Sequence, residues 1–290
     1  MKKALLVIFI FFIQFGISQE IKEKSLLWEI SGNGLEKPSY LFGTVHIACQ
    51  GEIQMYPELQ SAFDQTEQLI LELDMDDPGM MAKMMQASLA KDGKKVSEKL
   101  GEKLSVKVDS LMQQRMGMGL TMFENLNLPT LSVQLGMLAI DCPMDLGYDM
   151  LLMTEAQTVQ REVKGLESVE AQIEVLFSMS DEEAIQAISY LVENFGEAQT
   201  QLKEMLNYYR NQEVQSLYNF TKASFEDPKY PQGNLEEFLD KRNESWIPVI
   251  EKEIKSTPSL IAVGAAHLAG EKGVINLLKK QGYQLKAVQK

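Results

Sequence analysis

Residues 39–46 read Ser-Tyr-Leu-Phe-Gly-Thr-Val-His, and residues 261–267 read Ile-Ala-Val-Gly-Ala-Ala-His. Both segments begin with an apolar, strand-like run and place a glycine three positions before a histidine. The chain contains only two histidines, His46 and His267, and both stand in this pattern. In open α/β sheets, ligands bind at the carboxyl ends of strands, where a glycine lets the backbone turn closely around a ligand. We therefore predict two strands that end at one site.

The segments around these two motifs indicate an α/β fold. Residues 26–32 form another strand-like run, which a Gly-, Asn- and Pro-containing loop separates from residues 39–46, and this predicts a hairpin. A helical pattern over 57–65 precedes an apolar, strand-like run over 68–74. We expect a central mixed sheet that carries both the N-terminal and the C-terminal motif. Its predicted parts are residues 26–77, 161–167 and 235–290.

Residues 78–222 are dominated by Ala, Met, Gln, Glu, Lys and Leu at helical spacing, which predicts a large helical insertion or cap. Helix starts are expected near Thr130 and after Ser180, where acidic residues follow a capping serine. Methionines 80, 81, 84 and 85 are predicted to share one helix face. Such a face can be an adaptable cover for substrates or simply core filler. We expect residues 19–290 to form a single domain.

Composition excludes several classes of protein. The chain of 290 residues has 28 Lys and Arg against 41 Asp and Glu, so its formal net charge is −13. A chain this acidic repels phosphate backbones, so we expect no nucleic-acid partner. Two cysteines are too few for a cysteine-based zinc finger or an iron–sulfur cluster.

The N-terminus has the pattern of a secretory signal. Lys2 and Lys3 precede an apolar run over 4–13, and the small residues Gly16 and Ser18 follow it. We predict a signal peptide over residues 1–18, with an uncleaved anchor helix as the alternative. After cleavage no second long apolar stretch remains, so we expect an exported protein, periplasmic or secreted, without a transmembrane segment.

Export would place the two cysteines in an oxidising compartment. A bridge between Cys49 and Cys142 would close a loop of about 90 residues, which the chain-entropy model values at about 4 to 5 kcal/mol. The alternative is two separate buried thiols, because sequence alone does not bring the pair within reach.

Two imidazoles do not complete a catalytic metal site, which needs three protein ligands and an open position. Glu72 interrupts an apolar strand-like run, and Glu167 closes another, so each is a candidate for the same site. The alternative for Glu167 is an acidic residue at a helix N-terminus. Asp74 and the acidic residues after it are expected in a solvated loop.

Several of these stretches resemble the TraB/GumN family, which is related to the TIKI metalloproteases and to ChaN-like and erythromycin-esterase-like folds. The resemblance covers about residues 26–288 and includes the motif glycines Gly43 and Gly264. The segments that carry it are 27–30, 40–46, 71–74, 165–167, 242–243 with Trp246, and 263–270.

This resemblance implies an exported, metal-dependent hydrolase, with peptidase as the expected activity on a peptide or other small substrate. It implies a divalent ion, Mn, Co or Zn, held by His46, His267 and Glu72. Glu72 or Glu167 would serve as ligand or general base, and Arg242 would bind a substrate carboxylate or stabilise an oxyanion. The alternative for Arg242 is a surface position on a helix. The alternatives for function are haem or small-ligand binding, or a non-catalytic envelope protein on the same fold.

Overall fold

The computed structural model describes residues 20–231 and 233–289. The predicted signal peptide, residues 1–18, lies outside this range. Six strands form the central sheet in the order β6-β4-β7-β2-β1-β8. Strands β6, β4, β7 and β2 run parallel, whereas β1 is antiparallel to both β2 and β8, so the sheet is mixed, as predicted. The bounds are β1 (Leu27–Gly32), β2 (Ser39–Thr44), β4 (Gln68–Leu71), β6 (Glu162–Gly165), β7 (Ser259–Gly264) and β8 (Tyr283–Val288).

The predicted hairpin joins β1 to β2, with Leu27 opposite Phe42. Its turn contains three successive residues with positive φ, Gly32 (78°), Asn33 (46°) and Gly34 (84°). Two glycines and an asparagine are the residues that tolerate this left-handed conformation best. Every residue of β2 is buried, as expected for a strand in the interior of a sheet.

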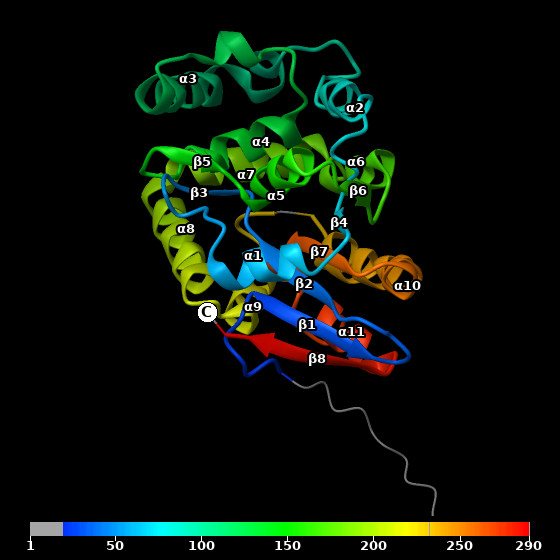
Figure 1. The fold of residues 1–290 in the computed structure, drawn as a ribbon. Helices are drawn as coiled ribbons and strands as arrows, with labels where there is room; N and C mark the ends of the chain where they lie inside the picture. Colours follow the sequence, from blue (N-terminus) through cyan, green and yellow to red (C-terminus); the bar gives the residue numbers. More distant parts are fainter. Residues whose placement is uncertain (1–19, 232, 290) are drawn as a thin grey trace, which may run out of the picture.

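Helices cover both faces of the sheet. Figure 1 shows α1 in front of the strands and α11 behind them. The main hydrophobic core joins sheet and helices and includes the fully buried rings of Trp28, Phe42 and Trp246. The surrounding helices are α1 (Pro57–Asp64), α5 (Tyr148–Thr158), α9 (Val214–Phe225), α10 (Lys241–Ser256) and α11 (Val274–Lys280).

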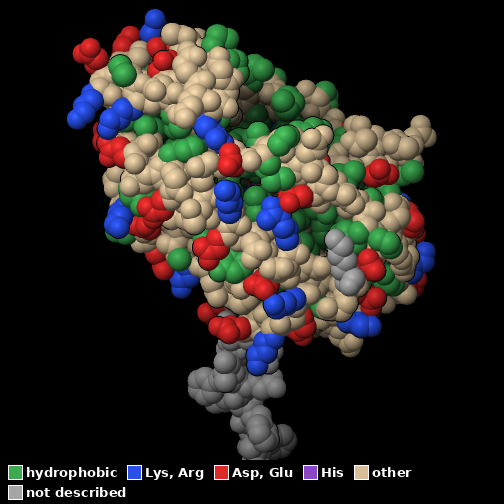
Figure 2. All heavy atoms as spheres, turned by 90° about the vertical axis from the view of Figure 1, so that its left-hand side faces the viewer, with side chains coloured by type: hydrophobic (Ala, Val, Ile, Leu, Met, Phe, Trp, Pro, Cys, Tyr) green, Lys and Arg blue, Asp and Glu red, His purple; other side chains and the backbone are tan. Residues whose placement is uncertain are grey.

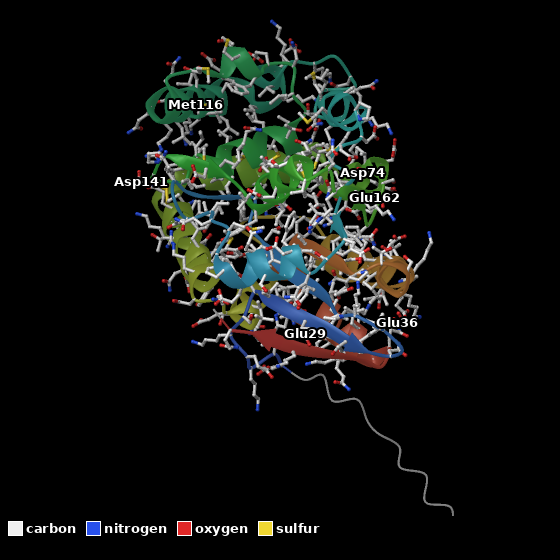
Figure 3. All side chains as sticks on the ribbon, viewed as in Figure 1. Glu29, Glu36, Asp74, Met116, Asp141 and Glu162 are labelled. Carbon is white, nitrogen blue, oxygen red and sulfur yellow. A yellow bond between two sulfur atoms is a disulfide. The ribbon has the colours of Figure 1, made fainter. Side chains whose placement is uncertain are left out.

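The helical insertion has a hydrophobic cluster of its own, which includes Val108, Leu131 and Ile188. Figure 3 shows Met116 in the uppermost helical layer and Glu29, on β1, toward the opposite end of the molecule. The insertion is mainly helical, as predicted, and β6 lies in the segment 161–167 that was predicted for the sheet. A three-residue strand, β5 (Met144–Leu146), was not predicted. Besides α5 and most of α9, its helices are α2 (Met80–Ala87), α3 (Val96–Met116), α4 (Leu128–Met137), α6 (Val169–Leu176), α7 (Asp181–Glu193), α8 (Phe195–Arg210) and the 3-10 turn η1 (Leu120–Phe123).

Both predicted helix starts have side-chain caps. The Asn127 side chain accepts a hydrogen bond from the Thr130 N–H at the start of α4. At α7, Ser180 and Glu183 form a reciprocal capping box, in which each side chain accepts from the other residue's backbone N–H. Local sequence therefore fixes where these helices begin.

The prediction that four methionines share one face of α2 is wrong. Met80 and Met84 pack with Leu73 and Val169 in a small hydrophobic cluster. Met81 and Met85 are 65% and 66% exposed. Neighbouring residues on a helix point about 100° apart, so the pair at 81 and 85 lies on a different stripe from the pair at 80 and 84.

A second, two-stranded sheet lies beside the main one. In it β3 (Ile47–Cys49), which follows His46 directly, pairs antiparallel with β5. A disulfide joins Cys49 to Cys142, with their Cα atoms 5.6 Å apart, at the end of this ribbon. The disulfide thus connects the segment after the first histidine to the helical insertion.

No helix among residues 20–231 and 233–289 is long and apolar enough to cross a membrane. Figure 2 shows acidic and basic side chains interspersed over one face, with hydrophobic side chains gathered beneath the uppermost helical layer. Met118 and Met122 are among the exposed hydrophobic residues of the insertion.

Candidate functional site

Four adjacent strand ends bring the predicted polar residues to one edge of the sheet. Because β6, β4, β7 and β2 are neighbours and parallel, their carboxyl ends share that edge. Glu167, Glu72, His267 and His46 follow these four strands in the same order. Both glutamates lie just beyond their strands, since β4 ends at Leu71 and β6 at Gly165. The sheet topology therefore gathers residues that are far apart in sequence.

Arg242 connects the two glutamates. It lies in the first turn of α10, directly after a π-helical turn, η2 (Glu236–Asp240), and its side chain is only 7% exposed. Its Nη2 lies 2.6 Å from Glu72 Oε2 and 2.6 Å from Glu167 Oε1. The guanidinium carbon also lies 4.8 Å from the centre of the Trp246 ring. The surface alternative for Arg242 is wrong, because a guanidinium between two carboxylates can be buried.

Glu167 has both carboxylate oxygens occupied by donors. Arg242 Nε lies 3.1 Å from each oxygen, and the Trp246 indole N–H donates to Oε2 at 3.2 Å. Gln172 Nε2 donates to Oε1 at 3.3 Å. Glu167 therefore anchors Arg242 and the start of α10.

Glu72 also accepts hydrogen bonds on both oxygens, and Oε2 accepts from Arg242 Nη2 and from Gln172 Nε2. Its Oε1 accepts a hydrogen bond from the Gly264 N–H at 2.8 Å and lies 3.9 Å from His267 Nε2. A side chain at Gly264 would place Cβ 3.3 Å from this oxygen, so glycine allows the close approach. Burial alone would raise the pKa of Glu72, but the charges of His267 when protonated, Arg242 and His46, with the Gly264 N–H, lower it to about 2. Glu72 is therefore a buried carboxylate that stays ionised.

The orientation of the His267 ring follows from Asn243. Asn243 Nδ2 donates to the carbonyl oxygens of Lys272 (2.9 Å) and His267 (3.4 Å), so its Oδ1 is the atom that faces His267 Nδ1 at 2.6 Å. An amide oxygen only accepts, so Nδ1 carries the proton and Nε2 has the lone pair. That lone pair accepts from Arg242 Nη1 at 3.2 Å. Burial lowers the pKa of His267 to about 3, and the ring is neutral at pH 7.

His46 is far more exposed than His267, but its Nδ1 also faces a side-chain oxygen. Its side chain is 69% exposed, and its Nδ1 lies 3.0 Å from Asp149 Oδ2. This hydrogen bond raises the pKa of His46 to about 9, with smaller contributions from the charges of Asp149 and Glu72. His46 is therefore charged at pH 7, and Asp149 keeps a proton on Nδ1.

The structure thus brings Glu72, Glu167, Arg242 and His267 into direct contact, and His46 lies near enough for its charge to affect the pKa of Glu72 and of His267.

No three His, Cys, Asp or Glu side chains in the described part of the chain are arranged as a metal-binding group. Both motif glycines have close packing roles, since a Cβ on Gly43 would lie 2.7 Å from Leu268.

Sequence reasoning missed Asp149. It lies in the first turn of α5, where an acidic residue is ordinary. The available signal was its position seven residues after Cys142, the cysteine that a predicted disulfide would bring close to His46.

The two histidines should make the free energy of unfolding of the metal-free protein fall on both sides of about pH 6.5, in an acid limb from His267 and an alkaline limb from His46. The folded-state pKa of His267 is about 3, below its usual 6.5, so stability falls as the pH drops from 6.5 toward 3, by about 3 kcal/mol at pH 4. The folded-state pKa of His46 is about 9, above 6.5, so stability falls as the pH rises from 6.5 through 9. Urea unfolding from pH 4 to 10 with a chelator measures both limbs.

Two variants separate the limbs. His267→Gln should flatten the acid limb, apart from the loss below pH 4.5 that Glu72 contributes, and His46→Gln should flatten only the alkaline limb. Equal profiles for wild type and both variants would contradict the assigned environments.

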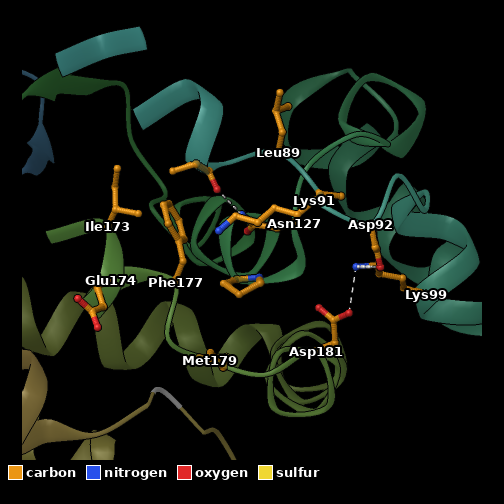
Figure 4. Close-up of a pocket in the computed structure, with 13 residues that line it drawn as sticks. Leu89, Lys91, Asp92, Lys99, Asn127, Ile173, Glu174, Phe177, Met179 and Asp181 are labelled. Carbon is orange, nitrogen blue, oxygen red and sulfur yellow. Dashed lines mark hydrogen bonds and ion pairs between the residues drawn. The ribbon is translucent and has the colours of Figure 1, made fainter. Parts of the chain in front are cut away.

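A cavity of about 440 Å³ lies in the helical insertion (Figure 4). At its edge Lys99 bridges Asp92 and Asp181, each at 3.0 Å. The residues that line it include none of the predicted site residues, so this cavity is separate from the cluster at the sheet edge.

Comparison with known proteins gives one positive finding. The sequence model of the TraB/PrgY/gumN family matches residues 26–287. No curated protein and no solved structure matches the chain.

Proposed function

The chain belongs to the TraB/PrgY/gumN family, and on that premise we propose that it is a metal-dependent hydrolase whose divalent cation binds at the carboxyl edge of the sheet. The observation that carries this proposal is the matching orientation of the two histidines. Asp149 faces Nδ1 of His46, and Asn243 faces Nδ1 of His267. Metal-binding histidines characteristically have one ring nitrogen fixed by such an oxygen, which directs the other nitrogen to the metal.

The charges of the cluster support a cation. Glu72, Glu167 and Arg242 together carry one more negative than positive charge, and neutral His267 adds none. In the metal-free protein the protonated His46 is paired with the Asp149 carboxylate, so this pair leaves the excess of one negative charge in place. A cation would replace the proton that charges His46, because metal ligation requires neutral imidazole.

The donor atoms define which residues would hold the ion. His46 Nε2, His267 Nε2 and Glu72 Oε1 are the proposed ligands. The two Nδ1 atoms face Asp149 and Asn243, and Arg242 and Trp246 donate to the oxygens of Glu167. Glu72 Oε1 instead lies 3.9 Å from His267 Nε2, where one ion could contact both atoms. Two nitrogens and one oxygen suit Zn, Co or Mn. A bound divalent ion supplies Lewis acidity, which polarises a scissile carbonyl and acidifies water.

The other residues have supporting roles in this proposal. A pKa of about 2 makes Glu72 a weak base, which favours a ligand role over a general-base role. Glu167 holds Arg242, whose Nη1 in turn donates to His267 Nε2 in the metal-free state. If His267 Nε2 held the cation, Arg242 Nη1 would lose this acceptor and would be available to donate to a substrate oxygen.

The proposed substrate is a peptide or another small molecule, and the proposed location is outside the cytoplasm. The disulfide between Cys49 and Cys142 supports export, because disulfides persist in oxidising compartments.

The test combines elemental analysis of the purified protein with a peptide-library cleavage assay. Wild type should contain about one equivalent of Mn, Co or Zn and cleave a subset of peptides. His46→Ala and His267→Ala should each lose the metal and at least about 100-fold of the activity, because each removes one of three ligands. A chelator should abolish wild-type activity, and adding the metal back should restore it.

Two outcomes would contradict the proposal. One is equal metal content and equal activity in wild type and both variants. The other is a Soret band on haemin titration that both histidine variants lose, which would instead support a haem-binding function.

A further inference from the structure

Both carboxylate oxygens of Asp149 make hydrogen bonds to residues at the end of β2, one to His46 and one to Thr44. Oδ2 lies 3.0 Å from His46 Nδ1, and Oδ1 accepts a hydrogen bond from the Thr44 hydroxyl at 3.2 Å. The Asp149 side chain is 13% exposed, whereas the His46 ring is 69% exposed. The position of the Asp149 carboxylate is therefore restricted by burial and by Thr44, whereas the orientation of the exposed His46 ring depends on its hydrogen bond to Asp149.

The backbone at the start of α5 packs directly against the His46 segment. The Tyr148 N–H donates to the Val45 carbonyl at 3.2 Å. A Cβ at Gly147 would overlap that carbonyl oxygen and lie 2.6 Å from the Cα of His46, so only glycine fits at this position. The positive end of the α5 dipole also favours a carboxylate in the first turn.

The β3–β5 ribbon connects the two partners covalently and by hydrogen bonds. His46 immediately precedes β3, and Gly147 immediately follows β5, with Ile47 opposite Leu146. At the other end of the ribbon the Cys49–Cys142 disulfide closes it. The Gly51 N–H also donates to the Asp145 carboxylate at 2.6 Å. His46 and Asp149 therefore lie at the open end of a ribbon that is clamped at its far end.

From this geometry we propose that Asp149, held by Thr44 and the disulfide-closed ribbon, is the positioning residue that fixes the His46 ring with Nε2 directed to the cation. The inference rests on the proposed function, since it concerns the same site. An exposed imidazole without a partner samples several ring orientations and both neutral tautomers. Removing such a partner typically weakens metal affinity 10–100-fold.

The chain's two histidines make a direct test possible. Imidazole-¹⁵N NMR of the metal-free protein at pH 10, with histidine alone labelled, would show only His46 and His267. Asp149→Ala should change His46 from a single Nδ1–H tautomer to a mixture and leave His267 unchanged. Its Zn²⁺ dissociation constant, measured calorimetrically at pH 7.5, should rise about 10–100-fold. Asp149→Asn should keep the Nδ1–H tautomer, because an amide oxygen still accepts, and recover part of the affinity.

Thr44→Val is a second variant, which keeps the Asp149 carboxylate but removes the hydroxyl that holds it. It should also give His46 a mixture of tautomers and raise the Zn²⁺ dissociation constant, in both cases by less than Asp149→Ala does. Unchanged His46 signals in Asp149→Ala, or a Zn²⁺ affinity within about twofold of wild type, would overturn the inference. If wild type binds no Zn²⁺, the proposed function is contradicted, whereas a tautomer change confined to His46 still supports Asp149 as its positioning residue.

Discussion

Replacing Arg242 by methionine should lower the free energy of unfolding by about 3 to 5 kcal/mol, the typical cost of leaving a buried charge without its partner. The substitution keeps most of the side-chain volume but leaves Glu72 and Glu167 facing each other as unpaired carboxylates. Their side chains are only 9% and 8% exposed, so water cannot replace the guanidinium. Urea unfolding at pH 7.5 measures the loss.

Three comparisons make this result specific. Arg210→Met removes an arginine from an exposed ion pair with Glu52 and should cost less than about 1 kcal/mol. Combining Arg242→Met with Glu72→Gln and Glu167→Gln should recover much of the stability. The deficit of the single variant should also shrink from pH 8 to pH 4, because an unpaired buried carboxylate takes up a proton. Equal losses for Arg242→Met and Arg210→Met would contradict the buried cluster.

Removing the disulfide should have an effect of similar size. Cys49 and Cys142 are 93 residues apart, and in the chain-entropy model the double substitution to serine costs about 4 to 5 kcal/mol. The same change opens the ribbon that carries His46 and Asp149, so the His46 ring signals should broaden while those of His267 stay sharp. Denaturant unfolding together with ring-¹⁵N NMR measures both effects.

Wild type treated with a reductant is the matched control and should behave like the double variant. A stability loss below about 1 kcal/mol would show that the ribbon is held without the disulfide.

The sequence predicted the strands and their polar ends because both features are local. The two glycine–histidine motifs, and Glu72 after an apolar run, carry their signal within a few residues. The hairpin was predictable for the same reason, since Gly32 and Gly34 supply the turn. The family match over residues 26–287 confirms the resemblance on which the wider interpretation was built.

The contacts that build the site depend on long-range topology, which local patterns do not specify. Arg242 stands on an amphipathic helix and looks like a surface residue until the strand order brings two glutamates from 75 and 170 positions away. Asp149 looks like an ordinary helix-start acid until the β3–β5 pairing places it beside His46. Strand β5, with three residues, is too short to show a period-2 pattern.

A Zn²⁺ titration followed by ring-¹⁵N NMR at pH 7.5 asks most directly whether the two imidazoles share one ion. One equivalent of Zn²⁺ should shift the Nε2 signals of both His46 and His267, leave both Nδ1 protons in place, and produce no further change beyond that equivalent. Signals that move for one ring alone, or for neither, would contradict a shared cation at the carboxyl edge of the sheet.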